Sequence, residues 1–175
     1  MIIPVEELTS MDEFSGKSEK VLKRKLNAVE QLIRSYTNNN FQNRNIRFHG
    51  NSAGDTIIGH NPFLKVGDTV QISQSMVNDG LYLITEIQDK FIRLDAELFD
   101  FPLNLVTKVE YPADVQEGVI ELMVWEAKNR QKVGIKSETL SRHRVDYYDQ
   151  DAENQVMGYP VALLGFLKPY MKARF

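Results

Sequence analysis

The chain has 175 residues, of which 42% are hydrophobic and 26% are charged. This balance is typical of a globular protein with one domain, or with one domain that carries an insertion. The formal net charge is −3, which argues against sequence-specific DNA binding, because DNA-binding proteins usually present a strongly basic face to the phosphates.

Three classes of protein are disfavoured by the composition. The sequence has no cysteine, so disulfides and metal sites built on thiolates are excluded. No apolar run reaches the roughly 18 residues of a membrane-spanning helix, and we expect no membrane association. The first residues lack the basic region of a secretory signal. We therefore expect a protein of the cytoplasm, or a particle assembled there.

The first 40 residues have the pattern of helices. Ser10 and Glu13 have the spacing of a capping box, which predicts the start of a short helix. Ser18 predicts the start of a longer helix, and the TNNN run over 37–40 predicts its end. Between them, apolar residues recur at steps of three and four and define one buried face: Leu22, Leu26, Val29, Ile33 and Tyr36.

The periodicity changes to that of strands between residues 41 and 111. Short β-type runs are expected at 45–49, 69–73, 81–87, 91–94 and 106–111, with 50–54 as a loop. The Asn78-Asp79-Gly80 sequence is a strong turn signal, because glycine adopts positive φ at little steric cost. The runs predict a small antiparallel β module that resembles an SH3-like barrel.

Helical spacing returns after Pro112. Apolar residues between Val115 and Ala127 cover more than one face of the expected helix, which indicates burial on several sides, within the chain or against a neighbouring subunit. The sequence thus predicts an α+β fold. Residues 1–40 and 112–175 form a helical bundle, and residues 41–111 form the inserted β module.

No pattern of residues points to catalysis, a cofactor or a metal. His49 and His60 flank Asp55, but their separation matches no standard metal-ligand spacing. Ser137 and His143 lack the G-x-S-x-G turn of a nucleophilic serine. The glycines do not form a phosphate-binding loop. We therefore expect a protein that is not an enzyme and that has no catalytic, cofactor-binding or metal site.

The last residues of the chain combine aromatic and basic side chains, which is typical of a docking surface. A partner groove would cover apolar surface that otherwise faces water. The residues expected to dock are Phe166, Lys168, Tyr170, Lys172, Arg174 and Phe175.

A second set of residues is expected at contacts between subunits. Large aromatic side chains dominate the energetics of interfaces, although Trp125 also suits a core position and the strand near Val145 also suits a sheet edge. The set is Val119, Leu122, Met123, Trp125, Val145, Tyr147 and Tyr148.

Several of these segments together resemble the head–tail connector proteins of long-tailed bacteriophages, also called head-completion or adaptor proteins. The resemblance covers the helix pair over 4–37 with its IRSYTNNNF ending, the apolar helix that follows Pro112, the GIKSET and RVDYY segments, and the GYP…FLKPY terminus. Together these are over half of the chain. The β module departs from the minimal pattern of this family.

The resemblance implies a non-enzymatic structural protein of the virion neck, assembled in the host cytoplasm. It implies a ring, usually of twelve copies, that binds the portal protein, extends the DNA channel and meets a tail-proximal connector or tail-completion protein. Residues 161–175 would dock on the portal, and residues 135–148 would contact neighbouring subunits or the channel. The alternative that the residues leave open is a peptide- or protein-binding module that uses the SH3-like β domain.

Overall fold

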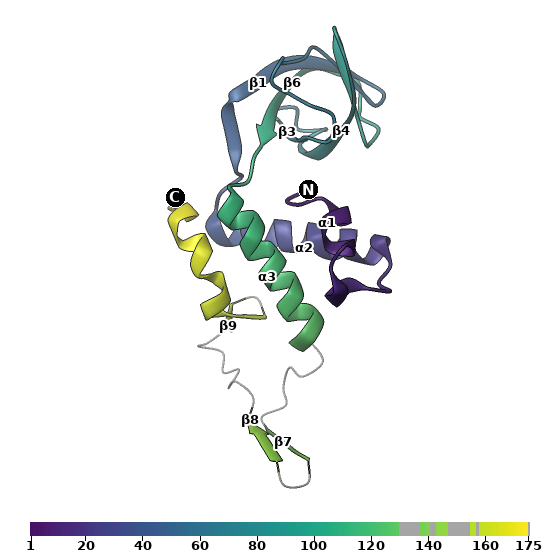
Figure 1. Cartoon of the computed structure of the whole chain (residues 1–175). Helices are drawn as coiled ribbons and strands as arrows, with labels where there is room; N and C mark the ends of the chain where they lie inside the picture. The colour runs from purple at the N-terminus through teal and green to yellow at the C-terminus, as the bar shows by residue number, and fades with distance from the viewer. Residues whose placement is uncertain (130–136, 141–142, 147–154, 157, 175) are drawn as a thin grey trace. The chain divides into compact units, whose positions relative to one another are not determined.

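The structure is a computed structural model of the whole chain, and it describes residues 1–129, 137–140, 143–146, 155–156 and 158–174 (Figure 1). The chain forms two compact units. The barrel unit contains Met1 and Asn40–Tyr111, and the helical unit contains Ile2–Asn39 and Pro112–Phe175.

The barrel unit is a closed antiparallel barrel of six strands, in the order β1-β2-β5-β4-β3-β6 (Figure 1). The strands are β1 (Gln42–Ala53), β2 (Thr56–Ile58), β3 (Thr69–Ser73), β4 (Gly80–Gln88), β5 (Phe91–Leu94) and β6 (Phe101–Val109). The prediction of a helical bundle with a small, SH3-like β insertion is therefore wrong, because the closed barrel dominates the fold.

Apolar side chains fill the inside of this barrel because strand residues alternate between the two faces of a sheet. Val70 and Ile72 on β3 are fully buried, with Gln71 between them only partly buried. Strands β2, β4, β5 and β6 contribute buried residues to the same core: Ile57, Ile84, Ile92, Leu94 and Val106. From β1, the partly buried Ile46 and Phe48 pack against this core.

Closure depends on a segment for which the sequence predicts a loop. β1 continues through Gly50 to Ala53, and its pairing with β6 shifts register between Asn43 and Arg47 and again between Gly50 and Ser52. Such irregularities bend a strand and increase its twist. A Cβ at Gly50 would lie 2.5 Å from the backbone oxygen of Ile58 on β2, so the close approach of the two strands requires glycine.

The helical unit is built from both ends of the chain. Its elements are α1 (Val5–Thr9), the 3₁₀ helix η1 (Asp12–Phe14), α2 (Glu19–Thr37), α3 (Ala113–Asn129) and the 3₁₀ helix η4 (Val161–Tyr170), with the short strands β7 (Ser137–Leu140), β8 (His143–Asp146), β9 (Gln155–Val156) and β10 (Tyr159–Pro160). The predicted apolar face of α2 is confirmed, since Leu22, Leu26, Val29 and Ile33 are buried.

The ends of the first helices follow the sequence only in part. Ser18 is the N-cap residue of α2, and Asn38 ends this helix in the left-handed conformation with φ of 49°. The capping box expected at Ser10 and Glu13 does not form, because Ser10 lies just after α1 and its hydroxyl donates to the Glu7 carbonyl oxygen.

Candidate functional site

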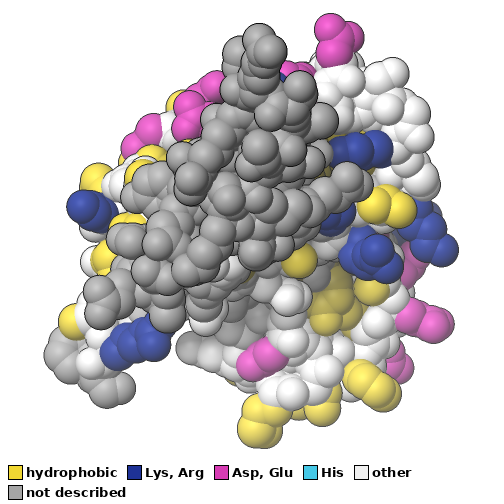
Figure 2. Space-filling model, turned by 90° about the horizontal axis from the view of Figure 1, so that it is seen from below, with side chains coloured by type: hydrophobic (Ala, Val, Ile, Leu, Met, Phe, Trp, Pro, Cys, Tyr) yellow, Lys and Arg dark blue, Asp and Glu magenta, His cyan; other side chains and the backbone are white. Residues whose placement is uncertain are grey.

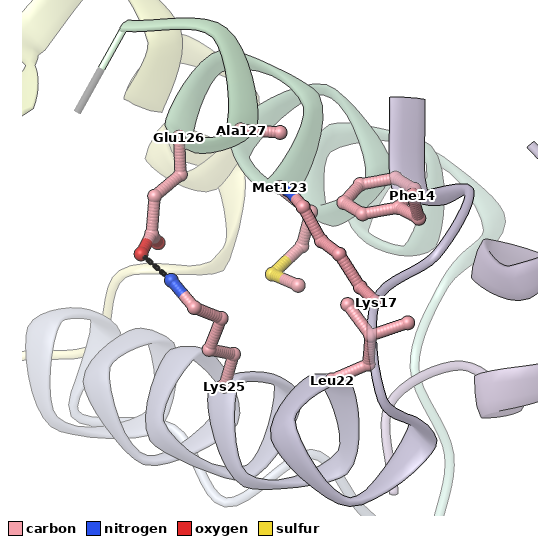
Figure 3. Close-up of a pocket in the computed structure, with 7 residues that line it drawn as sticks. All are labelled: Phe14, Lys17, Leu22, Lys25, Met123, Glu126 and Ala127. Carbon is pink, nitrogen blue, oxygen red and sulfur yellow. Dashed lines mark hydrogen bonds and ion pairs between the residues drawn. The ribbon is translucent and has the colours of Figure 1, made fainter. Parts of the chain in front are cut away.

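A small pocket opens between η1, α2 and α3 of the helical unit (Figure 3). Its volume is about 210 Å³. Apolar side chains form much of its lining, and Lys17, Lys25 and Glu126 complete it: the apolar residues are Phe14, Leu22, Met123 and Ala127. We call this the helical pocket.

Charged groups at the helical pocket have partners of their own. Lys25 on α2 forms an ion pair with Glu126 on α3 (Figure 3). The Tyr159 hydroxyl donates to the other carboxylate oxygen of Glu126 at 2.7 Å. The Lys17 ammonium lies 5.1 Å from the centre of the Phe14 ring, within range of a cation–π interaction. The helical pocket therefore combines buried apolar side chains, the ion pair between Lys25 and Glu126, and the exposed ammonium group of Lys17.

The helical pocket is small, and most of its apolar side chains are almost fully buried. Pockets for small molecules usually have volumes of about 300–1,000 Å³, which is larger than the 210 Å³ found here. Among the described residues, no group of three or more His, Asp or Glu side chains could hold a metal ion. His49 and His60, considered above as ligands, lie on or next to the strands β1 and β2 of the barrel unit.

The basic, aromatic terminus is held by its own chain. The Lys172 amide donates to the Thr37 carbonyl oxygen at 2.8 Å, and the Arg174 guanidinium donates to the Ser35 carbonyl oxygen at 2.8 Å. Asn38 and Asn39 donate to carbonyl oxygens of the terminus. Since the last carbonyls of a helix lack partners within it, the terminus completes the C-terminal end of α2.

Two of the aromatic residues expected to dock on a partner also have contacts within the helical unit. The Phe166 ring packs against Gly118, where a Cβ would lie 2.5 Å from the ring. The Tyr170 hydroxyl donates to the Asp114 carboxylate at 2.7 and 2.8 Å, and this hydrogen bond raises the pKa of the tyrosine. Lys168 and Lys172 have exposed side chains, and Phe175 lies outside the described residues.

The residues expected between subunits divide into three groups. Val119, Leu122 and Met123 are at most 1% exposed, and this burial assigns them to the core of their own chain. Trp125 is partly buried and packs against Tyr159 with ring centroids 5.7 Å apart. Val145 lies on β8, whereas Tyr147 and Tyr148 lie outside the described residues.

Strands β7 and β8 form an antiparallel ribbon, in which Ser137 pairs with Asp146 and Leu140 with His143. Within the described residues, each of these strands pairs only with the other. A two-stranded ribbon alone is marginally stable in water.

One surface of the barrel unit was missed by the sequence analysis. Asn78, in the loop between β3 and β4, donates to the Phe99 carbonyl oxygen at 2.9 Å and accepts from the Phe99 amide at 2.9 Å. These bonds hold two loops together and leave large apolar side chains in water. Met76 is 87% exposed, Val77 51% and Phe99 71%.

The surface around these apolar side chains is acidic. Asp79, Asp95, Glu97 and Asp100 are exposed on the same two loops. Burial raises the pKa of the nearby Tyr82 hydroxyl, and the charges of Asp79 and Asp95 raise it further. We call Met76, Val77, Phe99 and these four acidic residues the acidic rim. The sequence signal for it is the alternation of acidic and apolar residues over 95–100.

On the face of the molecule shown in Figure 2, some basic side chains lie next to hydrophobic ones. Within the described residues, no helix combines the length and the apolar character needed to cross a membrane. No family of known proteins matches the chain, and neither do the curated proteins or the solved structures.

Proposed function

We propose that this protein is a structural component of a bacteriophage virion, a head–tail connector whose copies form a ring between the portal protein and a tail-proximal protein. The order of elements in the helical unit supports this proposal: a short helix and a long one, an apolar helix, a ribbon, and a helix led by a Gly-Tyr-Pro sequence. The motifs that carry the resemblance lie on these elements or between them.

The observation that carries the proposal is the β7–β8 ribbon. Its strands follow α3 in the chain and pair only with each other among the described residues. The outer edges of such a ribbon present backbone donors and acceptors to any strand or loop of a neighbour. In a ring each subunit has two neighbours, so both edges of the ribbon have a chain available to cover them.

The hydrogen bonds that hold residues 170–174 change which side chains we propose for the contact with the portal protein. Hydrogen bonds to the end of α2 fix the backbone of residues 170–174, so the exposed side chains there are presented by an ordered segment. Ordering before binding lowers the entropic cost of association. We propose that Lys168, Lys172 and the half-exposed Met171 make the contact with the portal protein.

The experiment that tests this function is deletion of the gene from the phage or prophage that encodes it. Lysates imaged by negative-stain electron microscopy should contain DNA-filled heads and separate tails, and a plasmid copy of the gene should restore joined particles. Intact, infectious particles from the deletion strain would contradict the proposed function.

A variant with two substitutions tests the proposed contact with the portal protein directly. Lys168→Glu combined with Lys172→Glu should fail to restore joined particles, because two favourable charges become unfavourable. Lys90→Glu, on an exposed turn of the barrel unit, is the matched control and should restore them. Full complementation by the double variant would remove these two residues from the portal contact.

A further inference from the structure

We propose that the acidic rim is the docking surface for a second protein, and that this partner presents lysine or arginine side chains around a large apolar one. The Phe99 ring lies at the centre of the contact, and the carboxylates around it pair with the basic side chains of the partner. The inference goes beyond the proposed function and does not depend on it, because that function assigns no partner to the barrel unit.

The aromatic ring of the acidic rim is held in water by a network of hydrogen bonds. Phe99 is 71% exposed, although its amide donates to the buried Asn78 side chain and its carbonyl oxygen accepts from the same side chain. The Ser52 hydroxyl donates to that carbonyl oxygen at 2.7 Å. Asn78 also donates to the Asn104 side chain at 3.1 Å, within the barrel. The exposure of the ring is therefore a property of the folded loop.

Two further apolar side chains extend this surface on the β3–β4 loop. The Val77 amide donates to the carbonyl oxygen of the buried Ser75 at 2.7 Å, and the Asn78 amide donates to the Ser75 hydroxyl at 2.8 Å. These bonds close the loop on itself and leave Met76 87% exposed and Val77 51% exposed. Exposed apolar side chains that gather on a folded protein commonly mark a binding site.

Carboxylates of the acidic rim are fixed through one oxygen. Oδ1 of Asp79 accepts from the amide and the hydroxyl of Ser75, and Oδ1 of Asp95 accepts from the Leu83 amide at 2.8 Å. Burial raises the pKa of the Tyr82 hydroxyl and both carboxylates raise it further, so the two charges act at the same place. The second oxygen of each carboxylate has no bond within the described residues and can accept from a partner.

No basic side chain neutralises this negative charge. The segments 74–79 and 95–100 contain no lysine, arginine or histidine. The nearby Arg93 already pairs with Asp55 and Glu86. Among the described residues, no ion pair includes any of the four acidic residues of the rim: Asp79, Asp95, Glu97 and Asp100. Such a surface repels nucleic acid and anionic lipid and attracts a basic protein.

The apolar and the acidic parts of the rim together define the chemistry of the partner. An aromatic anchor contributes most of the binding free energy when the contact excludes water around it. Opposite charges at the edge of the contact orient the partner and accelerate its association. A basic segment that carries a large apolar side chain meets both requirements.

The first experiment uses two short synthetic peptides as probes. In one, phenylalanines are flanked by lysines, and in the other, glutamate replaces every lysine. The full-length protein, labelled with ¹⁵N, is titrated with each peptide and followed by NMR. The lysine peptide should shift the amide signals of residues 75–79 and 95–100, and the glutamate peptide should not. Equal shifts from the two peptides would overturn the inference, as would a lysine peptide that shifts none of these signals.

The contribution of the aromatic ring is tested by truncation. Phe99→Ala should weaken binding of the lysine peptide at least about tenfold, as expected for an aromatic anchor. Phe63→Ala is the matched control, because Phe63 is 68% exposed on the same unit, between β2 and β3. Both side chains are exposed, so neither substitution removes a core contact. Equal affinities of the two variants for the peptide, measured by fluorescence anisotropy, would overturn the inference.

A reversal of one charge tests the acidic part of the rim separately. Glu97→Lys should weaken binding of the lysine peptide and strengthen binding of the glutamate peptide. Asp89→Lys changes the net charge by the same amount on the exposed turn between β4 and β5, and it should leave both affinities close to those of the unchanged protein. Equal effects of the two substitutions would mean that the peptides respond to net charge alone, and this result would overturn the inference.

Sedimentation velocity distinguishes a different protein from a second copy of this chain, whose C-terminal residues are also basic. The unchanged protein and Phe99→Ala should sediment alike over a range of concentrations, because the proposed contact does not join copies. Self-association that is lost in Phe99→Ala would identify a second copy as the occupant of the rim and overturn the inference.

Discussion

The two units of the chain are stabilised in different ways. The barrel unit is formed almost entirely by one continuous stretch, Asn40–Tyr111, and each of its strands pairs with two neighbours. The helical unit joins residues from both ends of the chain, and its last residues complete the end of α2. Local sequence therefore specifies much of the barrel, whereas the helical unit depends on contacts between residues more than a hundred positions apart.

The acidic rim and the helical pocket differ in the same way, since one is formed by nearby loops and the other by segments far apart in the chain. In the barrel unit, the acidic rim is held by buried amides within adjacent loops. In the helical unit, the helical pocket exists only where η1 and α2 meet α3. A change in the barrel core should therefore alter the acidic rim and leave the helical pocket intact, and the reverse should hold for the helical core. The following predictions test this independence.

The largest effect is expected from truncation of one core residue in each unit. Ile84 in the barrel and Leu122 in the helical unit are both 0% exposed. Replacement of either by alanine should destabilise its own unit by about 2–5 kcal/mol, the cost of a large cavity. Trp125 is the only tryptophan and lies on α3, so its fluorescence during urea unfolding reports the helical unit alone.

Unfolding of the two units in a single transition would contradict their independence. Leu122→Ala should lower the midpoint of the fluorescence transition, and Ile84→Ala should leave that midpoint unchanged while it lowers the transition seen in amide exchange of the barrel strands. A fluorescence midpoint lowered equally by both variants would mean that one cooperative transition includes the barrel and the helices.

A second, somewhat smaller effect is expected in the barrel alone. The Asn78 side chain donates to Phe99 and to Asn104 and accepts from the Phe99 amide, and it is only 2% exposed. Asn78→Ala removes the acceptor of the Phe99 amide and the donor to the Asn104 side-chain oxygen, whereas the Phe99 carbonyl oxygen keeps its bond from the Ser52 hydroxyl. The loss should cost about 1–3 kcal/mol and release the Phe99 loop. Hydrogen exchange at the Phe99 amide should accelerate, and stability close to that of the unchanged barrel would contradict this account.

Much of the secondary structure could be predicted from the sequence, because periodicity is a local property. The apolar face of α2 and the strand over Thr69–Ser73 lie where the alternation of apolar residues placed them. Closure of the barrel could not be predicted. The glycines at 50 and 54 predict a loop, whereas Gly50 lies within β1. The position needs glycine because a Cβ there would clash with β2.

The candidate site was predicted less well, for a physical reason. The basic, aromatic composition of the terminus indicates that it docks on something, but composition does not say on what. The partners of residues 170–174 include backbone carbonyls at the end of α2 and the Asp114 carboxylate. Backbone acceptors leave no mark in the sequence. Similarly, nothing local to Val119, Leu122 or Met123 distinguishes a core residue from an interface residue.

A third prediction concerns the packing of η4 on α3. A Cβ at Gly118 would lie 2.5 Å from the ring of Phe166, so Gly118→Ala should displace that ring and destabilise the helical unit by about 1–3 kcal/mol, as overpacking does. Gly165→Ala is the matched control, because no atom lies within 4 Å of its added Cβ. The Trp125 fluorescence midpoint should fall for the first variant only, and equal midpoints would contradict the packing.

The smallest effect separates two causes of a raised tyrosine pKa. Burial is the main cause for Tyr82 in the barrel unit, and a hydrogen bond to the Asp114 carboxylate is the main cause for Tyr170 in the helical unit. Each tyrosine is therefore held protonated by the fold. Such a group stabilises the folded state below the unfolded pKa of about 10, and its contribution is lost as the pH rises through the higher folded pKa.

Asp114→Asn distinguishes the two causes in one titration. The substitution removes the negative acceptor, so the pKa of Tyr170 should fall toward its usual value while that of Tyr82 stays raised. NMR of tyrosine labelled at Cζ follows the ionisation of each ring separately. As the pH rises through the raised pKa of Tyr170, the unchanged protein should also lose the contact between Tyr170 and α3, and Tyr170→Phe should show no such pH-dependent step. An unchanged pKa of Tyr170 in the Asp114→Asn variant would mean that burial, as in the barrel, holds this proton too.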